Sequence, residues 1–88
     1  MTPELEVLDQ LLCDDLPIGV IAGLFSNRAH CRRAIGAMLR EGEVQVLDPA
    51  GRPLPGWRYR ELEGDPAFWG KASPYRLAIT DVGADRLA

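Results

Sequence analysis

The sequence predicts a small α+β domain that is mainly helical. Apolar residues recur at three- and four-residue spacing through the first half of the chain, which is typical of amphipathic helices. Alternating, β-branched stretches follow at residues 43–48 and 75–79, which is typical of strands. A chain of 88 residues forms one domain with a modest core, so these elements are expected to share that core.

The first two helices are predicted at residues 3–13 and 17–24. Thr2 supplies a hydroxyl N-cap, and Pro3 follows at the first helical position, where proline is favoured. The first helix has an apolar face made by Leu5, Leu8, Leu11 and Leu12. The second helix is short and carries two glycines, which weaken it in isolation and let a neighbouring segment approach closely.

The longest helix is predicted at residues 27–41, with Asn27 as N-cap and Gly42 as the C-terminal stop. Its apolar stripe consists of Cys31, Ala34, Ile35, Met38 and Leu39. Its other face carries Ala29, Arg32, Arg33, Gly36 and Arg40, with Arg28 in the first turn. Small residues between arginines let a helix lie close to a partner while the cations reach past it. The major groove of B-DNA, roughly 12 Å wide, admits such a helix.

The second half of the chain is predicted to form strands, a long loop and a closing helix. The expected elements are strands at 43–48, 57–60 and 75–79, and a helix at 81–87 capped by Thr80. At 57–60, both aromatic rings are expected on one side and both arginines on the other. Phe68 and Trp69 are expected to dock on the core, because exposed loops rarely carry two large aromatic side chains. The connection at 49–74 is long for so small a domain, which indicates a function or a further element.

Positive charge is gathered in the middle of the chain. The net charge is −3, but residues 26–60 hold seven arginines against three acids, and residues 1–25 hold five acids and no Lys or Arg. Local potential, rather than net charge, decides where a polyanion docks. The alternative is that these arginines pair with the acids of the chain on a solvated surface.

Residues that carry chemistry are sparse. Cys13 and Cys31 fall on apolar faces of the predicted helices, which favours small buried thiols over a disulfide framework. His30 is the only histidine, so no zinc-ligand spacing exists. The chain has no phosphate-binding or dinucleotide-binding glycine motif. We therefore expect no enzymatic activity, no cofactor and no metal. Without a long apolar run or a signal pattern, a cytoplasmic protein with no membrane partner is expected.

Two segments resemble the winged helix-turn-helix DNA-binding domain of bacterial and phage transcription regulators. They are I-A-G-L-F-S-N-R-A-H-C-R-R-A-I-G-A-M-L-R-E-G-E-V at 21–44 and Y-R-L-A-I-T-D-V-G-A-D-R-L at 75–87. The resemblance implies one winged-helix domain over residues 1–88, with a three-helix bundle and a β-hairpin wing. The residues that it places toward DNA are Asn27, Arg28, His30, Arg32 and Arg33. The chain departs from the family in a turn at 24–26 that is one residue short and lacks glycine, and in a longer wing.

Two functions are predicted as alternatives. The first is a small transcription regulator of phage or mobile-element type that binds double-stranded DNA, reading bases with Arg32 and Arg33. Its backbone contacts would come from Arg40 and from the wing residues Arg52, Arg58 and Arg60. Such regulators usually bind as homodimers. The alternative is a protein-interaction module that uses the aromatic residues Trp57, Tyr59, Phe68 and Trp69, which would otherwise extend the core.

Overall fold

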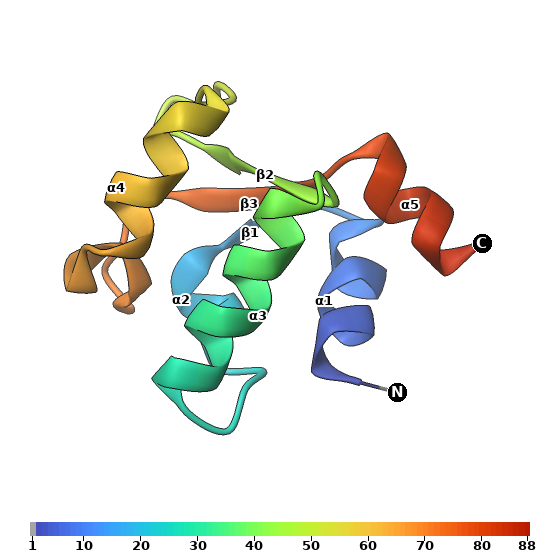
Figure 1. Ribbon diagram of the computed structural model, residues 1–88, viewed down its shortest axis with the longest axis horizontal. Coiled ribbons are helices and arrows are strands. Elements are labelled where there is room, and N and C mark those ends of the chain that lie inside the picture. The colour runs from blue at the N-terminus through green and yellow to red at the C-terminus, as the bar shows by residue number, and fades with distance from the viewer. Residues whose placement is uncertain (1) are drawn as a thin grey trace.

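The computed structural model describes residues 2–88 (Figure 1), and its class is α+β and mainly helical, as predicted. The elements in chain order are α1 (Pro3–Leu11), β1 (Leu16–Pro17), α2 (Ile18–Ala22), α3 (Arg28–Arg40), β2 (Val44–Leu47), η1 (Gly56–Arg58), α4 (Tyr59–Glu63), η2 (Pro66–Trp69), β3 (Arg76–Ile79) and α5 (Asp81–Leu87). Within residues 2–88, no helix combines the length and apolar character that crossing a membrane requires.

The three strands form one antiparallel sheet in the order β1-β3-β2. Leu77 at its centre lies opposite Leu16 on one side and Val46 on the other. The sequence did not predict β1, and the helix expected from residue 17 begins at Ile18 instead. Pro17 has an extended backbone and no N–H, so it suits the edge strand that it occupies.

Arg76 holds β1 against β3. Its Nε donates to Asp15 Oδ2 at 2.5 Å, and its Nη2 donates to the Asp15 carbonyl oxygen at 2.9 Å. The hydrogen bond from Arg76 lowers the pKa of the Asp15 carboxyl below its ordinary value, because it stabilises the charged form. The residue that precedes this two-residue strand is therefore held by a partner 61 positions away in sequence.

The core lies between the first three helices and the sheet. All five residues of the predicted apolar stripe of α3 are buried, which confirms that prediction. Both predicted N-caps are present: the Thr2 hydroxyl accepts from the Leu5 amide, and the Asn27 side chain accepts from the His30 amide at 2.8 Å. The connection from α2 to α3 spans residues 23–27 and includes Gly23, so the short turn without glycine that the sequence predicted is wrong.

The first helix is shorter than predicted, and this changes the position of Cys13. Helix α1 ends at Leu11, so Leu12 and Cys13 fall in the turn that follows it. Leu12 is 53% exposed and Cys13 is exposed. The prediction of two buried thiols is therefore right for Cys31 and wrong for Cys13.

The predicted strand at 57–60 is wrong, because these residues are helical in η1 and α4. An isolated bridge between Leu47 and Pro53 ends the extended pairing, and Pro55 then begins the helical turn. The Tyr59 hydroxyl accepts from the Val46 amide and donates to the Leu54 carbonyl, so this ring faces inward. Trp57 instead is 73% exposed, so the two rings do not share a side.

The remainder of the segment 49–74 is more ordered than the predicted irregular loop. Besides α4, it contains η2, which is capped by Asp65 through a 3.0 Å bond from the Ala67 amide. Phe68 and Trp69 are buried and pack edge-to-face, with ring centroids 4.9 Å apart. Their predicted docking on the core is confirmed.

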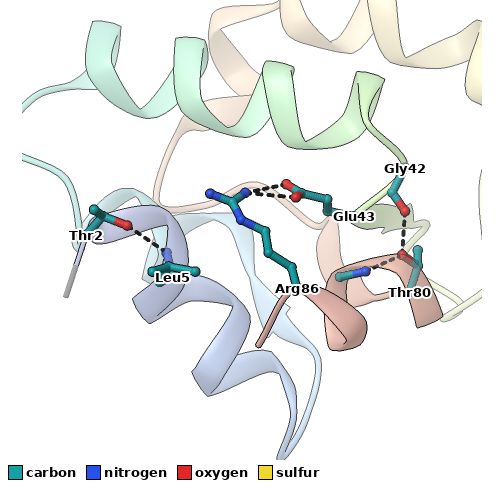
Figure 2. Close-up of polar contacts among 7 residues, drawn as sticks. Thr2, Leu5, Gly42, Glu43, Thr80 and Arg86 are labelled. Atoms are coloured by element: carbon teal, nitrogen blue, oxygen red, sulfur yellow. Dashed lines mark hydrogen bonds and ion pairs between the residues drawn. The ribbon is translucent and has the colours of Figure 1, made fainter. Parts of the chain in front are cut away.

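Helix α5 is fastened to the end of α3 by polar contacts (Figure 2). Arg86 Nη1 donates to both carboxylate oxygens of Glu43, at 2.7 and 2.8 Å. The Thr80 hydroxyl donates to the Gly42 carbonyl oxygen and accepts from the Gly83 amide. Gly42 has a φ of 75°, which fits its predicted role as the stop of the helix. Glu43 is thus a buried acid whose charge is paired.

We predict that Gly83→Ala destabilises the domain. A Cβ at Gly83 would collide with the Glu43 carbonyl oxygen and lie 2.9 Å from Ile79 Cγ1. Because the obstacle is main chain, relief requires α5 to move, at a cost of about 2 kcal/mol or more in the free energy of unfolding. Urea denaturation measures this, with Gly64→Ala as control, where the new methyl meets nothing closer than 3.7 Å. Equal midpoints for the two variants would contradict the prediction.

Candidate nucleic-acid interface

The outer face of α3 presents arginines separated by small residues. Arg28, Arg32, Arg33 and Arg40 are exposed, as predicted, and so are Ala29 and Ala37. Ala29, Arg33 and Ala37 are spaced by four and form one strip along the helix. Within residues 2–88, Arg28 and Arg33 form no ion pair. Their charge is therefore available to a partner outside the domain.

Helix α4 lies beside α3 (Figure 1), and its Glu63 contacts the middle of the predicted face. Arg32 Nη2 donates to the Glu63 carbonyl oxygen at 3.0 Å, and Arg40 Nη1 lies 3.6 Å from Glu63 Oε2. Gly36, which the sequence placed on the open face, is buried. A Cβ on Gly36 would lie 3.3 Å from Glu63 Oε2, so the absence of a side chain lets α4 approach.

Two hollows follow the line where α3 and α4 meet. One has a volume of about 340 Å³ and is lined by Ala29, Arg32, Arg33, Arg40 and Glu63. The other has a volume of about 300 Å³ and is lined by Leu39, Arg40, Gly56, Tyr59, Arg60 and Glu63. Arg40 and Glu63 line both hollows, so the two adjoin at this ion pair, and we call them together the α3–α4 groove. It brings Arg60 of the predicted wing next to arginines of α3.

The other wing arginines lie elsewhere on the segment. Arg52 is exposed on the tight turn after β2, where its amide donates to Asp48. Arg58 stacks over the Trp57 ring at 5.9 Å and lies 3.7 Å from Glu61. Arg58 is thus engaged by its neighbours in sequence, and Arg52 and Arg60 remain exposed.

The two remaining predicted site residues are engaged at the start of α3. Asn27 uses its side-chain oxygen to cap the helix. His30 Nε2 lies 3.7 Å from Glu4 of α1, and its ring meets Phe25 edge-on at 5.1 Å. Both side chains therefore support the N-terminal end of α3, where the strip of Ala29, Arg33 and Ala37 begins.

Glu63 is the residue at this site that the sequence did not predict. The segment 59–63 carries Tyr59 and Leu62 three apart with charged residues between them, which is the spacing of one helical turn. That pattern could have indicated a helix, but its position against Gly36 depends on contacts that are distant in sequence. Within residues 2–88, no group of three or more His, Cys, Asp or Glu side chains is placed to hold a metal ion.

The aromatic residues of the alternative hypothesis do not form one surface. Phe68 and Trp69 are each 2% exposed, and the Trp69 indole N–H donates to the Glu63 carbonyl oxygen at 3.0 Å. Tyr59 is half-buried. Of the four, Trp57 alone is largely exposed.

We predict opposite behaviour for the two tryptophans. Trp69→Ala removes a buried ring and a hydrogen-bond donor, and should lower the free energy of unfolding by about 3–5 kcal/mol. Trp57→Ala should change it by less than about 0.5 kcal/mol, since the ring is exposed. Urea denaturation followed by far-UV circular dichroism compares the variants. A Trp69→Ala protein as stable as Trp57→Ala would show that Trp69 is not a core residue.

We also predict that Cys31 is unreactive toward alkylating reagents in the folded protein, whereas the exposed Cys13 reacts. Burial raises the pKa of the Cys31 thiol to about 11, because the charged thiolate is poorly solvated. At pH 8, about 0.1% of this thiol would be thiolate, the reactive form. Iodoacetamide at pH 8 should therefore modify Cys13 alone in native buffer and both cysteines in urea, as read by peptide mass spectrometry. Rapid modification of Cys31 in native buffer would contradict this.

The site is thus a groove and an exposed strip that together present the arginines of α3 and Arg60, with Glu63 between them. In comparisons with known proteins, no family model, no curated protein and no solved structure matches this chain.

Proposed function

We propose that the domain is a winged helix that binds double-stranded DNA through α3, as a small transcription regulator. The order of elements supports this fold: β1 precedes α2 and α3, which are joined by a short turn, and β2 and β3 follow them, with the three strands paired in the order β1-β3-β2. The segment between β2 and β3 would then be the wing. Its helical content makes it larger than a simple hairpin loop.

The observation that carries the proposal is the exposed strip of α3. Ala29 and Ala37 leave room for a surface to approach the helix, and Arg33 lies between them, with Arg28 five residues earlier at the start of the helix. A guanidinium group donates to guanine O6 and N7 in a planar, two-bonded arrangement. Arg33 is therefore the best-placed residue for reading bases, and Arg28 would hold a phosphate.

The position of α4 refines the roles of the other arginines. Arg32 uses one nitrogen for the Glu63 carbonyl oxygen, so its remaining donors would reach DNA from a fixed position. Arg40 and Arg60 flank the α3–α4 groove, where backbone phosphates would lie. In this proposal, Arg52 at the tip of the turn after β2 contacts the backbone farther along the duplex.

The test is the salt dependence of binding to a random-sequence duplex, measured by fluorescence anisotropy between 25 and 200 mM KCl. Arg28→Ala/Arg33→Ala should weaken binding and reduce the slope of log K against log salt by about 0.9, because the phosphate held by Arg28 is no longer neutralised. Neither side chain forms an ion pair within residues 2–88, so stability should be unchanged.

A matched control separates the local effect from net charge. Leu12→Glu/Val82→Glu also makes the net charge more negative by two, at exposed positions outside α3. This control should keep the wild-type slope. Absence of wild-type binding at the lowest salt, or equal losses of affinity in both double variants, would overturn the proposal.

A second candidate is a protein-interaction module, which one observation favours. Trp57 is exposed and follows two prolines, and the guanidinium of its neighbour Arg58 stacks on the ring. Tryptophan and arginine are among the residue types most common at interface hot spots. If the duplex does not bind, Trp57 is the position at which a protein partner should be sought.

A further inference from the structure

The Glu63 carboxylate lies in the middle of an otherwise basic groove. It is 3.6 Å from Arg40, and a side chain on Gly36 would begin 3.3 Å from it. Arg32 and Arg33 line the same groove. The carboxylate is therefore surrounded by more positive charge than it neutralises.

The main chain of Glu63 is held separately from its carboxylate. Its carbonyl oxygen accepts from both Arg32 Nη2 and Trp69 Nε1, each at 3.0 Å. Trp69 is buried, so α4 is anchored through this carbonyl whether or not the carboxylate has a partner. The ion pair with Arg40 is loose by comparison, since the Arg40 side chain is 66% exposed.

We propose that the α3–α4 groove is a phosphate-binding site in which the Glu63 carboxylate is the resident anion. A phosphodiester of the bound duplex replaces it at Arg40; this step rests on the proposed DNA-binding function. Hydrogen bonds between arginine and phosphate are charge-assisted and frequently two-bonded, so they are stronger than a single exposed ion pair at 3.6 Å. Gly36 lies beside this carboxylate and has no side chain, so a phosphate group that replaces the carboxylate meets no Cβ there.

Glu63 therefore lowers the affinity for any nucleic-acid backbone. A duplex must displace the carboxylate and then tolerate its negative charge close to a phosphate. Non-specific binding, which relies on phosphates alone, is penalised by the same amount as specific binding but has no base contacts to offset the penalty.

The test compares Glu63→Gln with Glu61→Gln on the random-sequence duplex. Both variants remove one negative charge from α4, but the Glu61 side chain is 70% exposed and pairs with Arg58 outside the groove. Glu63→Gln keeps the carbonyl that anchors α4, so it should fold as the wild type does. We expect it to bind about fivefold more tightly at 50 mM salt, and Glu61→Gln less than about twofold.

A double-mutant cycle tests whether Glu63 acts through Arg40. Arg40→Ala should reduce the salt slope by about 0.9, as expected when one phosphate is no longer neutralised. In that background, adding Glu63→Gln should raise the affinity no more than Glu61→Gln does. Equal effects of the two glutamine variants in the wild-type background would overturn the proposal, and so would an unchanged salt slope in Arg40→Ala.

Titration with inorganic phosphate tests the site without DNA. At constant ionic strength, replacing chloride by phosphate should shift the amide resonances of Gly36 and Arg40 in Glu63→Gln at lower concentration than in Glu61→Gln. If the duplex fails to bind but these shifts occur, the DNA-binding function is wrong. The phosphate site is then retained, as a site for a free phosphate ion. If the duplex binds and phosphate shifts neither resonance, the function stands and the phosphate site is wrong.

Discussion

The arrangement of the basic surface depends on one partly buried hydrogen bond, from the Trp69 indole N–H to the carbonyl oxygen of Glu63. Trp69 is fixed in the core by η2, and Glu63 is the last residue of α4. The bond therefore fixes α4 relative to the core. Helix α4 has only five residues and would not be stable in isolation. Through α4, the same bond sets the width of the groove along α3.

The long elements could be predicted from the sequence, and the short ones could not. The stripe of α3 repeats over three turns, so its buried face follows from spacing alone. Residues 57–60 are too few to distinguish a period of two from a helical turn, and in the structure a helical turn capped by Pro55 runs into them. Strand β1 exists because Arg76 and Leu77 lie beside it, and no local pattern reveals partners that far away in sequence.

The candidate site was predictable in composition but not in shape. The arginines of α3 are exposed as their spacing indicates, because the opposite face is apolar. Gly36 belongs to that face by spacing, yet it is buried under Glu63, which comes from a segment that the sequence suggested was irregular. The roles of Arg32 and Arg40 differ from that of Arg33 for the same reason. A single tertiary contact thus divides a face that looks uniform in sequence.

The central position of β3 has a consequence for the order in which the domain forms. Both β1 and β2 pair with β3, and β3 lies close to the C-terminal end of the described residues. During synthesis, neither β1 nor β2 finds its strand partner until residues 76–79 have left the ribosome. Helix α1 likewise packs against elements from late in the chain, α5 and β3, whereas α2 and α3 contact each other and can associate earlier. The exposed strip of α3 therefore forms from local sequence, whereas the sheet can form only after β3 has been synthesised.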